Sequence, residues 1–202
     1  MKTQYYTATS INGYLADENN SLDWLFQFEE IESMRDDSPR FIEQIGAMVM
    51  DSTTYEWIIE HENLLEEPEK WPYEIPVWVF SSRELSVVMG ADIRFVQGDV
   101  APVHTEMAEA TDDKNVWLVG GGDLAGQFHD QGLLDEIILS VAPVMLGSGA
   151  QIFPREIISP PLKLIDGGAV TVGGIHSLLA PNRFKTLCCR LHMMTREDRA
   201  SR

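Results

Sequence analysis

The sequence predicts an α/β fold, with helices on both faces of a mostly parallel central sheet and an antiparallel hairpin at its C-terminal edge. Short apolar stretches alternate with helical patterns along most of the chain, which is typical of parallel strands joined by helices. The apolar run Val116–Val119 leads directly into three glycines and a helical pattern. The last strand-like stretches follow one another without helices between them, which favours the hairpin.

The expected strands are short stretches rich in apolar, β-branched or aromatic residues. They span Gln4–Ala8, Ala47–Met50, Val77–Phe80, Ile93–Val96, Val116–Val119, Ile137–Val141, Leu162–Ile165, Val170–Val172 and Lys185–His192. The run Val116–Val119 has no polar alternation, so it predicts a strand that is buried on both faces.

The helical patterns lie between these strands. Leu22, Leu25, Phe26 and Phe28 predict a helix that begins near Ser21, whose hydroxyl is a suitable N-cap. Further helices are expected at Pro39–Ile45, Tyr55–Glu62 and Val103–Ala110, and one after the glycines. We expect a single domain over residues 1–195 and a frayed tail at 196–202.

Composition excludes several classes of function. The net charge of −17 argues against nucleic acid as a partner, because binding phosphate chains requires a basic surface. No apolar run approaches the ~20 residues of a membrane span, and the N-terminus lacks a signal-peptide pattern. The neighbouring Cys188 and Cys189 are expected to pack as reduced thiols in a cytoplasmic protein. No histidine or cysteine spacing indicates a metal site.

The glycine run Gly120–Gly122 is the strongest candidate for a ligand site. Glycines allow a sharp turn and a close approach of the backbone to a ligand. Asp123 is expected to start the following helix, whose N-terminal N–H groups attract anions. This arrangement suits a phosphate group. The alternative is a tight strand-to-helix turn with no ligand.

Five short segments follow strand ends, where the loops of a parallel sheet meet on one rim. They are Asn12-Gly13, Asp51–Thr54, Ser81–Arg83, Gly120–Gly122 and Ser140. Their expected convergence indicates a binding site more strongly than any one segment alone.

Several motifs resemble a known family. Val116–Phe128 resembles the glycine-loop segment of dihydrofolate reductase-like proteins. Leu133–Glu136 and Leu139–Pro154 resemble the bacterial riboflavin-biosynthesis reductase branch, which is RibD C-terminal domain-like. Three further segments match motifs of that branch in the right order: Ser10–Ala16, Thr54–Glu56, and Ser81–Arg83 with Leu85.

The resemblance implies a three-layer dihydrofolate reductase-like fold and an NADPH-dependent oxidoreductase. Such an enzyme passes hydride to a small heterocycle, namely a pterin, a pyrimidine or a ribosylamino-pyrimidine, at a C=N or ribosyl carbonyl or imine group. The substrate is a small molecule, and no nucleic acid or membrane is expected as a partner. The family also implies a homodimer.

Site residues follow from the resemblance by position. Those implied to bind the cofactor are Ala8, Gly13, Tyr14, Thr54, Ser82, Arg83, Gly120, Gly121, Gly122, Asp123, Leu124 and Ala125. Within this set, Ser82 and Arg83 would hold the adenosine 2′-phosphate, since a guanidinium suits a dianion. Asp23 and Ser140 are the implied catalytic residues, and Trp24 is implied to contact the substrate. Asp23 can alternatively be a surface aspartate at a helix cap.

Two departures from the family pattern bear on function. Asp51-Ser52 stands where the family has glycine and arginine, so a cation is lost and a carboxylate comes near the expected pyrophosphate. Asn12 replaces an aspartate. The first departure motivates an alternative function, a catalytically degenerate member that binds a nucleotide. Flavin in place of the nicotinamide cofactor is also compatible with the sequence.

Overall fold

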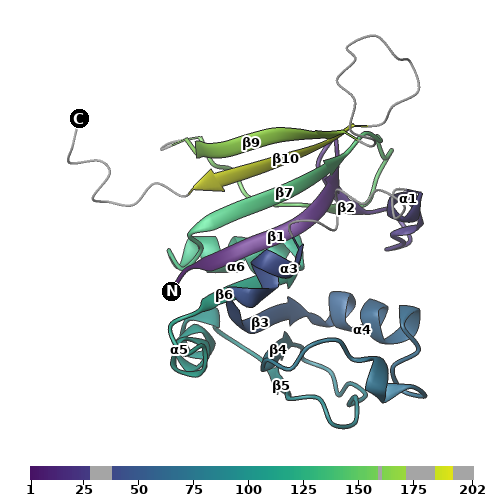
Figure 1. The fold of residues 1–202 in the computed structure, drawn as a ribbon, viewed down its shortest axis with the longest axis vertical. Coiled ribbons are helices and arrows are strands. Elements are labelled where there is room, and N and C mark those ends of the chain that lie inside the picture. Colours follow the sequence, from purple (N-terminus) through teal and green to yellow (C-terminus); the bar gives the residue numbers. More distant parts are fainter. Residues whose placement is uncertain (28–37, 159–160, 172–184, 193–202) are drawn as a thin grey trace, which may run out of the picture. The chain divides into compact units, whose positions relative to one another are not determined.

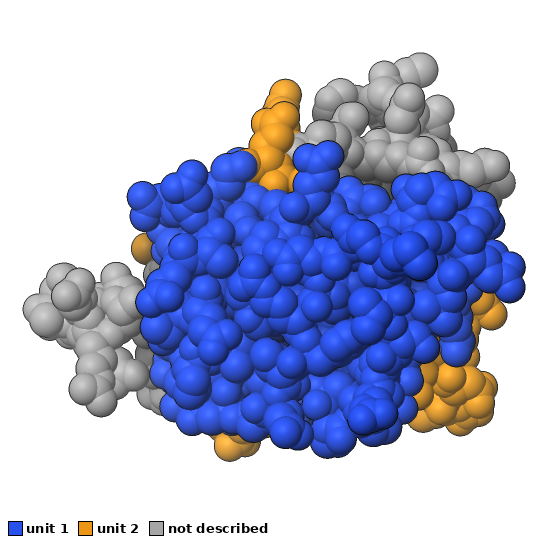
Figure 2. All heavy atoms as spheres, turned by 90° about the horizontal axis from the view of Figure 1, so that it is seen from below, with its two compact units in different colours: residues 1–5, 44–135 blue, residues 6–43, 136–202 orange. Residues whose placement is uncertain are grey.

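The computed structural model describes residues 1–27, 38–158, 161–171 and 185–192. The chain forms two compact units, coloured separately in Figure 2. Unit 1 comprises residues 1–5 and 44–135, and unit 2 comprises residues 6–43 and 136–202. The predicted single domain over residues 1–195 stays a prediction, and the predicted tail at 196–202 lies outside the described residues.

Unit 1 contains a parallel sheet in the order β5-β4-β3-β6-β1 (Figure 1). All of its neighbouring strands run parallel, which confirms the predicted strand arrangement. The strands are β3 (Ile45–Asp51), β4 (Val77–Phe80), β5 (Ile93–Val96), β6 (Asn115–Gly120) and the first residues of β1 (Thr3–Ser10).

Burial differs between the two central strands of this sheet. Residues 45–50 of β3 are all buried, as expected for an apolar strand covered on both faces. The same expectation for Val116–Val119 is wrong, because Trp117 and Val119 on β6 are only half-buried. The ring of Tyr73 covers this side of β6 in part, with its centroid 6.0 Å from that of Trp117.

Three helices and a short 3₁₀ turn accompany the sheet of unit 1. They are α4 (Ser52–His61), the turn η1 (Pro68–Lys70), α5 (Val100–Ala110) and α6 (Gly122–Asp130). Two of these helices begin earlier than predicted, because an aspartate caps each of them. Asp51 caps α4, and Asp99 caps α5 by accepting the Ala101 N–H at 3.2 Å.

The start of α6 also corrects the sequence prediction. Its N-cap is Gly121, not Asp123, which lies in the first turn and accepts a hydrogen bond from Gln127 at 2.9 Å. The physical reason is the backbone at Gly121, where φ is +88°, a region that non-glycine residues rarely adopt. The turn is therefore complete before Asp123 is reached.

Unit 2 contains the remainder of β1 and the antiparallel strands of the chain. The strand order is β1-β7-β10-β9, and β10 runs antiparallel to both of its neighbours. The bounds are β7 (Glu136–Ala142), β9 (Lys163–Thr171) and β10 (Lys185–His192). The predicted antiparallel C-terminal hairpin is thus confirmed. A second small antiparallel sheet joins β2 (Tyr14–Ala16) and β8 (Ala150–Gln151).

Some sequence predictions in unit 2 were wrong in detail. Two strands are predicted at 162–165 and 170–172, but β9 is continuous, because Gly167 and Gly168 pair with β10 through their backbones.

The helices of unit 2 also differ from the predictions. The first helix, α1 (Asp23–Phe26), has Leu22 as its N-cap, and Ser21 instead accepts the Asp23 N–H at 3.0 Å. The second, α3 (Ser38–Glu43), ends before Ile45, which already belongs to β3. Phe28 lies outside the described residues.

Within the described ranges, no helix combines the length and the apolar character needed to cross a membrane.

His104 on α5 ties this helix to the first strand of unit 1. Its Nε2 atom lies 2.8 Å from the hydroxyl of the buried Thr3. The backbone of Thr3 also exchanges two hydrogen bonds with Asp135, at 2.7 and 3.0 Å. Burial lowers the pKa of His104, and the nearby charge of Asp135 opposes this shift.

The lowered pKa of His104 predicts a loss of stability in mild acid. Between this pKa and about 6.5, the ordinary value, the unfolded chain binds more protons than the folded protein does. The contribution of His104 to the free energy of unfolding is therefore fully present above about pH 6.5, and it decreases as the pH falls below that value. Urea unfolding at several pH values should show a shallower pH dependence in His104→Gln. An identical dependence in both proteins would contradict this role.

Candidate functional site

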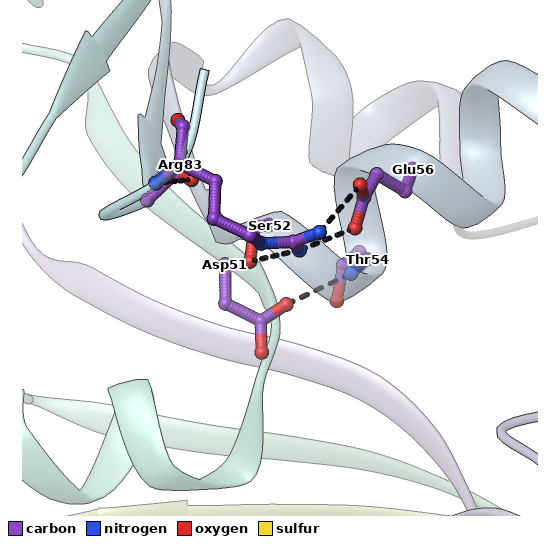
Figure 3. Close-up of polar contacts among 6 residues, drawn as sticks. Asp51, Ser52, Thr54, Glu56 and Arg83 are labelled. Atoms are coloured by element: carbon purple, nitrogen blue, oxygen red, sulfur yellow. Dashed lines mark hydrogen bonds and ion pairs between the residues drawn. The ribbon is translucent and has the colours of Figure 1, made fainter. Parts of the chain in front are cut away.

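The β3–α4 loop is the direct junction of these two elements, and it centres on the carboxylate of Asp51. Asp51 is the last residue of β3 and the N-cap of α4, and its Oδ1 atom accepts the Thr54 N–H at 2.9 Å (Figure 3). This contact satisfies one of the N–H groups that a helix leaves without an intrahelical partner. The side chain that departs from the family pattern therefore has a structural role in this loop.

The glycine turn before α6 lies directly against this loop. A Cβ atom added to Gly121 would lie 2.5 Å from Oδ2 of Asp51 and 2.6 Å from its Cγ. A Cβ added to Gly120 would lie 2.5 Å from Oγ1 of Thr54. Both glycines are thus required by the close approach of the neighbouring loop. This explains the absence of side chains here without any ligand.

One carboxylate consequently lies at the N-terminal ends of two helices. Asp51 caps α4 and contacts Gly121, the N-cap of α6. Helix N-termini favour negative charge, so this position suits an anion, and a side chain of the protein already lies there. Its charge also acts on Tyr5 of β1, where burial first and Asp51 second raise the pKa of the phenol.

Arg83 follows the end of β4 and reaches α4. The hydroxyl of Ser81 shapes the turn, since it accepts the Arg83 N–H and donates to the Arg83 carbonyl, both at 2.9 Å. The guanidinium of Arg83 donates from Nη1 and Nη2 to the two carboxylate oxygens of Glu56, at 3.0 and 2.6 Å (Figure 3). Nη2 also donates to the Ser52 hydroxyl at 3.3 Å. The carboxylate of Glu56 raises the pKa of Arg83, which therefore stays charged.

Nothing in the sequence pairs Glu56 with Arg83, because Glu56 enters only as the last residue of the motif Thr54–Glu56. One signal was available, because Ser52 and Glu56 are four residues apart and share a face of α4. No local pattern indicates that Arg83 lies against this face, because the contact joins helix α4 to the separate turn after β4.

The other predicted cofactor residues of unit 1 differ in accessibility. Ser82 is exposed beside Arg83, and Asp123 is exposed on α6. Leu124 and Ala125 are buried, so their side chains pack in the core. The Ala125 N–H donates to the Gly121 carbonyl at 3.0 Å, as part of the helix. Any contact of these two residues with a cofactor is therefore restricted to the backbone.

In unit 2, Gly13 and Tyr14 line a cavity of about 520 Å³. Gly13 has φ +82°, which closes the turn from β1 into β2, and its carbonyl accepts the Ile152 N–H at 2.9 Å. The remaining lining residues are Asn12, Gln151, Ile152, Phe153, Pro154, Arg155 and Glu156. The structure thus brings two of the predicted cofactor residues together at one cavity.

The predicted catalytic and substrate residues also lie in unit 2. Trp24 on α1 packs against Ala142 of β7, and Ser140 lies two residues earlier on the same face of that strand. The indole N–H of Trp24 is buried and has no hydrogen-bond partner among the described residues. Asp23 is exposed in the first turn of α1, and Ala8 is half-buried on β1. The roles of these four residues stay predictions.

Asn12 has a structural role that an aspartate could not fill. Its Nδ2 atom donates to the Leu146 carbonyl at 2.6 Å, and its Oδ1 accepts the Leu146 N–H at 3.1 Å. A carboxylate can accept but cannot donate, so only the amide binds both backbone groups. This second departure from the family pattern is explained by the loop that Asn12 holds.

In the part of the chain that the structure describes, no group of three or more histidine, cysteine, aspartate or glutamate side chains is arranged to hold a metal ion.

Comparison with known proteins supports the resemblance. The model of the RibD C-terminal domain family matches residues 2–174. The Bacillus subtilis (strain 168) protein YwjB is 29% identical over 159 residues, which cover 75% of this chain and 82% of YwjB. YyaP of the same organism is 25% identical over 152 residues, covering 72% of this chain and 77% of YyaP. Both relatives are described as uncharacterized proteins.

Solved structures share the fold. A riboflavin biosynthesis protein from Shewanella sp. PV-4 has a TM-score of 0.74 and 22% identity, covering 95% of this chain and 98% of its own. RibD from Acinetobacter baumannii has a TM-score of 0.63 and 15% identity, and the match covers 96% of this chain and 58% of RibD. Dihydrofolate reductase from Enterococcus faecalis, complexed with NADP(H), has a TM-score of 0.55 and 14% identity, covering 95% of both chains. These likenesses confirm the predicted dihydrofolate reductase-like fold.

The contact between Gly121 and Asp51 predicts that Gly121→Ala is strongly destabilising. The new alanine must adopt an unfavourable positive φ, and its methyl group must displace the side chain of Asp51, which caps α4. We therefore expect the free energy of unfolding to fall by about 2–4 kcal/mol. Gly132→Ala is the matched control, because Gly132 also has positive φ (+70°) but no atom within 4 Å of an added Cβ. We expect this control to lose about 1 kcal/mol in chemical denaturation. Equal losses in the two variants would show that the contact with Asp51 has no energetic effect.

Proposed function

The chain belongs to the RibD C-terminal domain family, and from this premise we propose that it is an NADPH-dependent reductase. The proposed reaction transfers hydride to a small heterocycle of the pterin, pyrimidine or ribosylamino-pyrimidine class. A bound nicotinamide cofactor supplies the hydride, and the protein binds and orients the two reactants. The solved Enterococcus faecalis relative carries NADP(H), which agrees with this cofactor class.

The observation that carries the proposal is the grouping of three loops in unit 1. The loops after β3, β4 and β6 follow the carboxyl ends of neighbouring parallel strands, where open α/β sheets bind ligands. Arg83 offers a permanent cation for a 2′-phosphate, with the Ser82 and Ser52 side chains beside it. The glycine turn at Gly121 and the N-terminus of α6 offer a backbone surface for a diphosphate.

The substrate side of the proposal rests on unit 2. The exposed carboxylate of Asp23 can accept hydrogen bonds from the N–H groups of a heterocycle, or transfer a proton to it. Trp24 is half-buried, and its exposed part can stack on an aromatic ring. The Ser140 hydroxyl can donate or accept a hydrogen bond at the ring. These roles come from position in the family pattern.

A second candidate function is supported by Asp51. Its carboxylate lies against the glycine turn, where it would repel a diphosphate in a protein whose net charge is already −17. This arrangement favours a catalytically degenerate member that binds a nucleotide or a flavin. Titration with NADPH, NADH and flavin mononucleotide separates the two candidates. Binding of the flavin alone would favour the second.

The leading proposal predicts that NADPH stabilises the protein. A ligand that binds only the folded state raises the melting temperature, so NADPH should do so in a concentration-dependent way. Arg83→Ala should weaken NADPH binding by about tenfold and leave NADH binding unchanged, because only NADPH carries the 2′-phosphate. Isothermal titration calorimetry measures both affinities.

Arg94→Ala is the matched control for this experiment. Arg94 is also exposed and paired with a carboxylate, Asp92, at 3.0 Å, but it lies on β5 and packs over the Trp78 ring. An NADPH preference that persists unchanged in Arg83→Ala would contradict the assignment of Arg83.

The position of Asp51 predicts that Asp51→Asn tightens NADPH binding by about threefold to tenfold. Asparagine caps helices as well as aspartate does, so α4 keeps its cap while the negative charge beside Gly121 is removed. The affinity is measured by calorimetry, and the melting temperature should change little.

Asp99→Asn provides the control, because Asp99 caps α5 in the same way but lies outside the proposed site. Equal tightening in both variants would show a general effect of net charge and no specific effect of Asp51.

A further inference from the structure

The ion pair between Glu56 and Arg83 lies within the proposed 2′-phosphate site. Both guanidinium nitrogens that face α4 donate to Glu56, at 3.0 and 2.6 Å, and one of them also donates to Ser52. This fork-to-fork geometry is the one that an arginine uses to bind a phosphate. A 2′-phosphate must therefore displace a carboxylate of the protein from the guanidinium, or share the cation with it.

Glu56 also has a direct use for a cofactor without the phosphate. In dinucleotide sites, a carboxylate accepts a hydrogen bond from the ribose 2′-hydroxyl of NADH, whereas an arginine accommodates the 2′-phosphate of NADPH. The structure places one of each in contact, on α4 and on the loop after β4. The side chains are 40% exposed for Glu56 and 58% exposed for Arg83, so both are accessible to a ligand.

We infer that Glu56 is a specificity-determining residue. It weakens the preference of the site for NADPH over NADH, so that the site accepts NADH as well. The inference rests on the proposed function. Glu56 acts in two ways: it occupies the Arg83 guanidinium, and it adds a negative charge that repels the 2′-phosphate. Arg83 and Glu56 together distinguish a phosphate from a hydroxyl at the ribose 2′ position, because Arg83 attracts the phosphate and Glu56 accepts a hydrogen bond from the hydroxyl.

The test compares the affinities of NADPH and NADH for the full chain and for Glu56→Gln, by isothermal titration calorimetry. Removal of the charge should tighten NADPH binding by about fivefold, the size expected for an exposed pair of good geometry. NADH binding should stay the same or weaken. Glu56→Ala, which also removes the oxygen acceptors, should change the ratio of affinities in the same direction.

Asp92→Asn is the matched control. Asp92 forms the equivalent two-point pair with Arg94, at 3.1 and 3.0 Å, and its replacement changes the net charge equally. In an Arg83→Ala background, the effect of Glu56→Gln should become smaller but stay above that of Asp92→Asn, because only the direct repulsion of the 2′-phosphate remains. An equal shift in Glu56→Gln and Asp92→Asn would overturn the inference.

The outcomes distinguish this inference from the proposed function. Binding of both dinucleotides with an unchanged ratio in Glu56→Gln would overturn the role of Glu56 and leave the reductase proposal standing. If neither NADPH nor NADH binds to the full chain or to any variant, the role of Glu56 and the reductase proposal are both overturned.

Discussion

The parallel pairing of β3 with β4 on one side and β6 on the other is the constraint on which unit 1 depends. Residues 45–50 of β3 are apolar or glycine and fully buried. Exposing this strand to water would remove the stabilisation that burial of its apolar side chains contributes to unit 1. Because the three strands run in one direction, the chain must leave all of them at the same edge. The β3–α4 loop, the turn at Ser81–Arg83 and the glycine turn are therefore neighbours as a result of the fold.

The side chains at this edge balance charge in an acidic protein. Asp51 lies at two helix N-termini, and Glu56 lies against Arg83, so each carboxylate has a local positive partner. These contacts stabilise the protein without a ligand. The positive groups at this edge, Arg83 and the two helix N-termini, therefore already have partners in the protein. The affinity for an anionic ligand depends on how much stronger its contacts with these groups are than the contacts with Glu56 and Asp51 that it replaces.

The sequence predicted much of the fold because periodicity and strand ends are local signals. β4, β5 and β10 have the predicted bounds, and the parallel arrangement followed from the alternation of strands with helices. The starts of α4 and α5 differ from the predictions, because Asp51 and Asp99 each cap a first turn that precedes the predicted start. For the site, the strand ends predicted a set of loops, and the individual residues followed from the resemblance to the family. Contacts such as that of Arg83 with Glu56 join a turn to a helix in another part of the sequence, and no local pattern encodes them.

The division of β1 between the two units has a consequence for how the chain folds. Thr3–Tyr5 pair with β6 in unit 1, and the following residues of the strand belong to unit 2, where β7 is the neighbour of β1. Neither unit is a continuous segment, so the first strand must wait during synthesis until distant parts of the chain have emerged. Deleting the first ten residues would remove a strand from both units at once. A fragment that begins after β1 therefore contains neither unit complete.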